Sequence, residues 1–128
     1  MTRKPGEAAL ALAAQPTSAR EARAFVRATL VELSIPEPPL EDTVLLAGEL
    51  VSNVVQHART RMQIHVTRRD RVVRVEVHDR NTHEPRAASG SLDATSGRGL
   101  FLVENLASNW GVEPTVDGKA VWFEIRLS

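Results

Sequence analysis

The chain has 128 residues, of which 42% are hydrophobic and 25% charged, which suffices for one globular domain but not for two. Sixteen basic residues balance sixteen acidic ones without a basic cluster, which argues against direct binding to nucleic acid or to an anionic membrane. Cysteine is absent, which excludes disulfides, thiolate catalysis and cysteine-ligated zinc. Because no run of about 18 apolar residues and no signal-peptide core occurs, we expect a cytoplasmic protein.

The first third of the chain predicts a tail, a strand and a helix. Residues 1–6 are expected to form a loose tail ahead of a single domain over residues 7–128. Alternating leucines predict a short edge strand from Glu7 to Ala14. A helix should begin near Ser18 and stop before the prolines of Pro36–Pro39, which exclude regular helix. Its apolar positions recur at helical spacing: Ala22, Phe25, Val26, Thr29, Leu30 and Leu33.

A second helix, predicted from about Leu40 to Ala58, carries an unusual polar stripe. Glu49 and Asn53 stand four residues apart, about one helical turn, and Gln56 shares their side of the helix with His57 at its edge. A carboxylate that can deprotonate a nucleophile, one turn from an amide oxygen that can bind Mg²⁺, would make half of a nucleotide site. A solvated helix face shows the same spacing, so spacing alone does not decide between the two.

Two β-hairpins are predicted after this helix. In the first, alternating residues 62–67 and 73–79 flank a short polar turn. In the second, residues 112–116 and 121–126 flank Asp117-Gly118, the expected turn, because Asp-Gly between alternating runs is a strong hairpin signal. Strands with one polar side indicate a sheet that helices cover on one face.

Between the hairpins lies a long segment of little periodicity, residues 80–96, followed by a predicted helix over residues 99–108. Irregular segments of this length inside a small domain are often functional. Glycines at Gly97 and Gly99, where the helix begins, would let a ligand approach the free backbone N–H groups, which favour phosphate. The predicted fold class is α/β (α+β): a two-layer sandwich of about five mainly antiparallel strands and three helices on one face.

Four blocks of the sequence, in this order, resemble small ATP-binding proteins of the GHKL superfamily, in particular the anti-sigma-factor serine kinases. Residues 49–58 look like the N box of that family, and Val75–Asp79 looks like the strand that leads to its adenine-binding Asp. Ser96–Leu106 looks like the glycine box after the ATP lid, and Gly118–Glu124 looks like the closing strands. The resemblance spans nearly the whole chain and implies a Bergerat-type ATP-binding fold, with ATP and Mg²⁺ as cofactors.

The resemblance also implies roles for individual residues. Glu49 would be the general base for the attacking hydroxyl, and Asn53 would be a ligand of Mg²⁺. Asp79 would accept a hydrogen bond from the exocyclic amine of adenine. The other residues expected to contact the nucleotide are Asn81, Gly97, Arg98, Gly99 and Leu100.

Two functions follow as hypotheses. In the first, the protein is a serine/threonine kinase that phosphorylates an anti-sigma-factor antagonist of STAS type and also binds a sigma factor, with a homodimer as a candidate assembly. In the second, it is a binding module without catalysis, or without nucleotide, that sequesters a sigma factor or another regulatory partner. The family pattern D-x-G-x-G reads Asp79-Arg-Asn81-Thr-His83 here, and the missing glycines favour the second hypothesis. The retained Glu49 and Asn53 favour the first. A histidine-kinase core is disfavoured, because no phosphoacceptor helix pair stands before residue 18.

Overall fold

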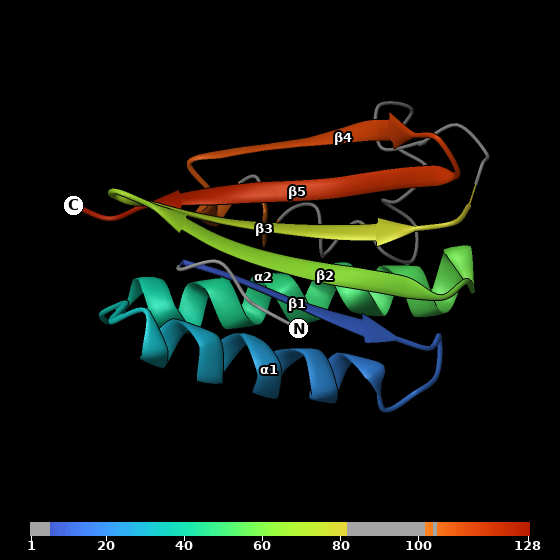
Figure 1. Ribbon diagram of the computed structural model, residues 1–128, viewed down its shortest axis with the longest axis horizontal. Helices are drawn as coiled ribbons and strands as arrows, with labels where there is room; N and C mark the ends of the chain where they lie inside the picture. Colours follow the sequence, from blue (N-terminus) through green and yellow to red (C-terminus); the bar gives the residue numbers. More distant parts are fainter. Residues whose placement is uncertain (1–5, 82–101, 104) are drawn as a thin grey trace.

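The computed structural model describes residues 6–81, 102–103 and 105–128, which form a sheet with helices on one of its faces (Figure 1). The strands are β1 (Glu7–Leu12), β2 (Met62–Arg69), β3 (Val72–Asp79), β4 (Asn109–Thr115) and β5 (Gly118–Arg126). The helices are α1 (Ser18–Glu32), α2 (Pro39–Asn53) and a π-helix, η1 (Val54–Ala58). The α+β fold class is thereby confirmed. None of the helices in these ranges is long and apolar enough to cross a bilayer.

The five strands form one sheet in the order β1-β2-β3-β5-β4, and every neighbouring pair in it is antiparallel. Strand β5 therefore lies between β3 and β4, although it follows both in the sequence (Figure 1). The register of β3 places Asp79 between Met62 on one side and Lys119 on the other. The end of β3 is consequently enclosed by a strand on each side.

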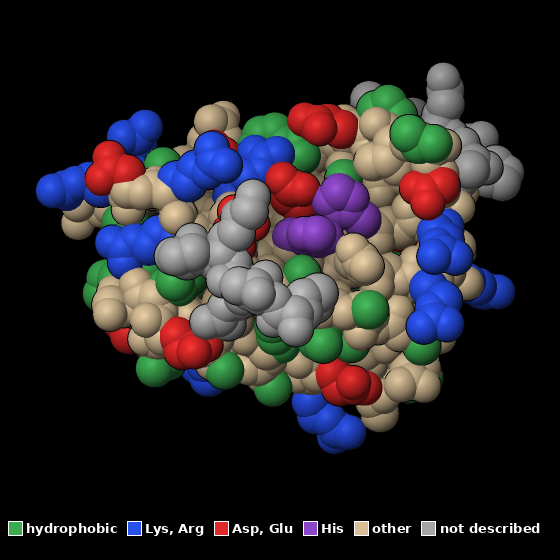
Figure 2. Space-filling view, viewed as in Figure 1, with side chains coloured by type: hydrophobic (Ala, Val, Ile, Leu, Met, Phe, Trp, Pro, Cys, Tyr) green, Lys and Arg blue, Asp and Glu red, His purple; other side chains and the backbone are tan. Residues whose placement is uncertain are grey.

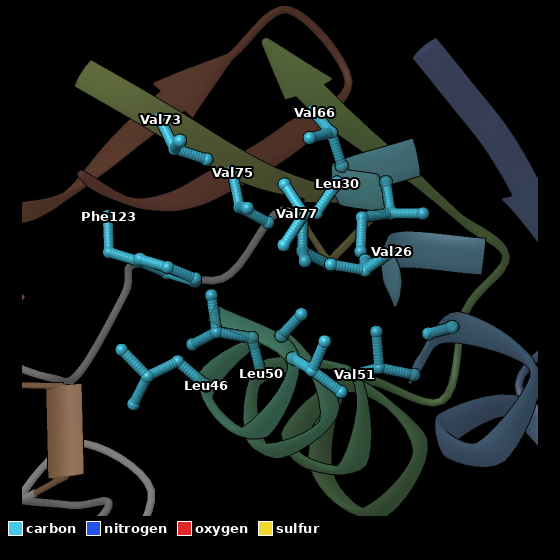
Figure 3. Close-up of a cluster of buried hydrophobic side chains, with 14 of the residues drawn as sticks. Val26, Leu30, Leu46, Leu50, Val51, Val66, Val73, Val75, Val77 and Phe123 are labelled. Carbon is cyan, nitrogen blue, oxygen red and sulfur yellow. The ribbon is translucent and has the colours of Figure 1, made fainter. Parts of the chain in front are cut away.

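The core lies between the sheet and the two long helices (Figure 3). Burial of one large apolar side chain contributes about 1.5–3 kcal/mol, so this layer accounts for much of the stability. The labelled side chains come from both layers: Val26, Leu30, Leu46, Leu50, Val51, Val66, Val73, Val75, Val77 and Phe123. Alternate residues of a strand share a face, so Asp79 lies on the same buried face of β3 as Val73, Val75 and Val77. It is the one charged residue in this row.

The second helix departs from regular α-helix near its end. It begins at Pro39, a position where proline fits because the first N–H groups of a helix have no partner within it. We predicted α-helix as far as Ala58, but the α-helix ends at Asn53 and η1 follows as a π-helix. Arg59 then ends the helix in the left-handed conformation, with φ of 58°. Single π-turns of this kind occur often beside functional sites.

The turn of the second hairpin lies one residue earlier than predicted. Thr115 pairs with Gly118, so Val116 and Asp117 form the turn and the prediction of Asp117-Gly118 is wrong. The physical reason is contact with β3, since a Cβ on Gly118 would stand 1.8 Å from the backbone oxygen of Asp79. Glycine is therefore required for the close approach of two strands and not for the turn.

Candidate functional site

The carboxyl-terminal ends of α2 and β3 lie at the same end of the molecule (Figure 1). Glu49 and Asn53 occupy the last turns of α2, and Asp79 is the last residue of β3. Helix α2 packs against β3 and β5, which fixes these ends relative to each other. The structure thus brings three residues that the sequence singled out to one end of the fold, although about 25 residues of chain separate the helix end from the strand end.

Glu49 and Asn53 lie on the side of α2 that faces away from the core. Both side chains are half-buried, whereas Leu50 and Val51 between them are fully packed. Because the α-helix continues to Asn53, the spacing of four residues does place the carboxylate and the amide on one face. The change to π-helix comes after this pair, and Gln56 and His57 are exposed. The polar stripe is therefore reduced to Glu49 and Asn53.

The carboxylate of Asp79 is fully enclosed, with 0% of its side chain exposed. Its Oδ1 accepts a hydrogen bond of 2.8 Å from the backbone N–H of Asn81, and its Oδ2 accepts one of 2.7 Å from the Lys119 ammonium. The chain leaving β3 is held in addition by the N–H of Arg80, which donates to Oγ1 of Thr60 at 3.0 Å. Asp79 is thus oriented by both neighbouring segments before any ligand arrives.

Lys119 is the member of this site that we did not predict. Only 17% of its side chain is exposed, and its partner is fully buried. The signal was present in the alternation of β5, because Lys119 shares the inward face with Val121 and Phe123. A charge at an inward strand position requires a partner of opposite sign, and the strand pairing offers Asp79.

A separate hollow of about 410 Å³ lies at the ends of β2 and β3. Gln63 and His78 contribute to it from the face of the sheet opposite to the helices, because they alternate with the buried residues of their strands. Neither Glu49 nor Asn53 lines it. The remaining lining residues are Ala11, Arg61, Met62, Asp79, Arg80 and Asp117. This hollow is therefore distinct from the helix face that carries Glu49 and Asn53, although Asp79 lines it.

The predicted phosphate contacts Gly97, Arg98, Gly99 and Leu100 lie outside the described residues and stay predictions. Within the described ranges, no group of three His, Asp or Glu side chains is arranged to hold a metal ion. Mg²⁺ that is bound through nucleotide phosphates needs only one or two oxygen atoms from the protein. Asn53 is half-buried, and its amide oxygen is a ligand of the right chemistry for that situation.

The opposite face of the sheet carries a charged network centred on Arg74. The guanidinium binds Glu76 at 2.6 Å and Glu124 at 3.0 Å, and it lies 4.1 Å from the ring centre of Trp122. His78 Nε2 stands 2.8 Å from Glu76 Oε1. Figure 2 shows histidine side chains among acidic and basic ones on this face. Side chains of opposite charge alternate on this face, so it is accessible to solvent and its charges are balanced.

The pKa values of Glu76 and His65, both on this face of the sheet, are shifted. Burial alone would raise the pKa of Glu76, but the hydrogen bonds from Arg74 and His78 outweigh it and hold this pKa below its usual range. Burial lowers the pKa of His65, and the neighbouring His78, whose ring centre is 4.8 Å away, lowers it further against the opposing charges of Glu76 and Glu7. The fold thus favours the neutral form of His65.

We expect acidification below the ordinary histidine pKa of 6.5 to destabilise the protein through His65. The unfolded chain binds this proton more readily than the folded one, so stability falls between pH 6.5 and the lower pKa of the folded state and levels off below it. His65→Thr should flatten the dependence of Tm on pH in that window. Arg69→Thr, an exposed position on the same face of β2, should keep the wild-type slope. An unchanged slope in His65→Thr would refute this assignment.

Comparison with known proteins agrees with the observed fold. Residues 12–125 match the family model of the histidine kinase-like ATPase domain. Among solved structures, the chain is similar to the RsbU and RsbW domains of Rv1364c from Mycobacterium tuberculosis, with a TM-score of 0.73 and 23% identity. The match covers 94% of this chain but only 32% of that one, so the chain spans about a third of its length. No curated protein matches the sequence significantly.

Proposed function

Because the chain belongs to the histidine kinase-like ATPase family, we propose that it binds ATP with Mg²⁺ and acts as an anti-sigma-factor kinase. Its substrate in this proposal is a serine of an antagonist protein of STAS type, and its second partner is a sigma factor. The similarity to a protein with an RsbW domain supports the choice of this branch of the family. The proposal places the nucleotide at the common end of α2 and β3.

One observation carries the proposal: a carboxylate and an amide one helical turn apart lie at the same end of the fold as a buried, oriented carboxylate. Asp79 has the acceptor chemistry that an adenine amine requires, and the Asn81 N–H holds it in a fixed direction. Asn53 would hold Mg²⁺, which neutralises phosphate charge when it is bound. Each of the three residues thus has a separate task.

The proposed reaction uses Glu49 as the general base. Its carboxylate accepts the proton of the serine hydroxyl while the hydroxyl oxygen attacks the γ-phosphorus of ATP. The bond between that phosphorus and the bridging oxygen breaks, and ADP leaves with the electron pair. Glu49 suits this role because it is half-buried and therefore still reachable from solvent.

Calorimetric titration with ATP and Mg²⁺ tests the proposal. We expect heat of binding in the range of micromolar to hundreds of micromolar nucleotide, and binding that weakens when Mg²⁺ is chelated. Asn53→Ala should remove most of the Mg²⁺ dependence, whereas Asp42→Ala near the start of α2 should not. Absence of binding at millimolar ATP would refute the proposal.

A nucleotide-independent binding module is the second candidate function. It is favoured by the hydrogen bonds of Asp79, because both of its carboxylate oxygens already have partners within the protein. It is also favoured by Asn81, which stands where the family pattern has glycine. In that case the same surface would hold a sigma factor without ATP. Binding of a sigma factor with equal affinity in the presence and absence of ATP would support this candidate.

A further inference from the structure

We propose that Lys119 masks the base-recognition carboxylate of Asp79, so that the adenine of ATP must displace the lysine in order to bind. The proposal rests on the ATP site of the proposed function and adds a control element to it. Lys119 would thereby set the affinity for nucleotide without any contact to the phosphates.

The ion pair between Asp79 and Lys119 fills the position at which a base would have to be recognised. The two residues face each other across β3 and β5, and the ammonium stands 2.7 Å from Oδ2. No part of the Asp79 side chain is exposed, whereas 17% of the Lys119 side chain is. A ligand that needs Oδ2 of this carboxylate therefore competes with the lysine ammonium that already occupies it.

An adenine amine is the weaker of the two competing donors. It is neutral, whereas hydrogen bonds between an ammonium and a carboxylate are charge-assisted and roughly twice as strong as neutral ones. The pair is also shielded from water, which strengthens the attraction between its charges. Only the fraction of molecules with an open pair binds the base, and the apparent Kd rises by the inverse of that fraction.

The structure confines this movement to one side chain. Gly118 lies against the backbone of Asp79 and Arg80, so the strands on either side of the pair are closely packed. The Asn81 N–H keeps Oδ1 fixed, and the carboxylate retains its direction when the ammonium leaves. The lysine has a flexible stem of four carbons, and its exposed part gives it a route to solvent.

Affinity for MgATP in Lys119→Met, measured by calorimetry, tests the proposal. If the pair is open about a tenth of the time, the variant should bind ATP about tenfold more tightly than the wild type. Lys119→Arg keeps a cation opposite Asp79 and should bind as weakly as the wild type. Arg126→Met alters an exposed cation on the same strand and should change nothing. Lys119→Gln provides a second neutral variant if Lys119→Met does not fold.

The outcomes separate this inference from the proposed function. If the wild type binds ATP and both neutral variants bind it no more tightly than the wild type, the masking role is overturned and the ATP site stands. Lower affinity would identify Lys119 as a contact of the base. Absence of binding in the wild type and in all variants would refute the ATP site, and with it the inference.

A second measurement needs no variant. Lysine occurs only at Lys4 and Lys119, so selective isotope labelling of lysine gives two side-chain signals in an NMR spectrum. Saturating MgATP should shift the Lys119 signal toward the position of a solvated ammonium and leave the Lys4 signal in place. A Lys119 signal that does not move while ATP binds would overturn the proposal.

Discussion

Replacement of Glu49 by alanine is expected to lower phosphoryl transfer by about 10²–10⁴-fold, the usual contribution of a general base. ATP affinity should stay close to that of the wild type, because the proposed contacts to base and metal come from Asp79 and Asn53. The measurement is transfer of labelled phosphate from ATP to a STAS-type antagonist, with ATP binding followed in parallel by calorimetry. The half-buried position of Glu49 makes the substitution mild for the fold.

Two further variants make the Glu49 result specific. Glu49→Gln keeps the size and hydrogen bonding of the side chain but cannot accept the proton, so it should be as inactive as Glu49→Ala. Asp42→Ala removes an acidic residue from the first turn of the same helix and should retain transfer. Transfer at the wild-type rate in Glu49→Ala would show that another group is the base.

Gly118→Ala is expected to be the most destabilising of the substitutions considered. The new methyl group would stand 1.8 Å from the backbone oxygen of Asp79 and 2.7 Å from Cα of Arg80. These are backbone atoms of a central strand end and cannot move aside independently, so β5 must shift. We expect a loss of about 3 kcal/mol, the upper range for overpacking, measured by urea unfolding. The same shift should pull Lys119 away from Asp79.

Gly48→Ala is the matched control for this substitution. Its Cβ would meet Arg23 side-chain atoms at 2.9–3.0 Å, and Arg23 is exposed and can take another rotamer. Alanine is also the better helix former by about 1 kcal/mol, which offsets the contact. Equal destabilisation by the two substitutions would contradict the role assigned to Gly118.

Much of this fold could be predicted because its elements follow simple periods. The apolar residues of α1 repeat at helical spacing, and those of β2 and β3 alternate, so α1 and the first hairpin were predicted correctly. Glu49 and Asn53 were found for the same reason, since four residues span one turn. That the carboxyl-terminal ends of α2 and β3 lie at the same end of the fold then follows from the order of the elements alone.

Three features could not be predicted from local pattern, and two of them have a tertiary cause. The π-helix after Asn53 keeps the residues of an ordinary helix and changes only their hydrogen bonding. The turn at Val116 and Asp117 overrides the Asp-Gly signal because Gly118 is needed against β3. The Asp79–Lys119 pair joins residues 40 positions apart, and only the strand order brings them together.

The position of β5 has a consequence for how the site forms on the ribosome. Asp79 is synthesised 40 residues before the lysine that neutralises it. At about 5–20 residues per second, the ribosome needs roughly 2–8 seconds to cover that distance, while small hairpins form in microseconds. The β2–β3 hairpin can therefore exist in the nascent chain with a solvated carboxylate at its end. The enclosed site arises only when β5, with β4 as its hairpin partner, pairs with the free edge of β3, so its assembly is a late event of folding.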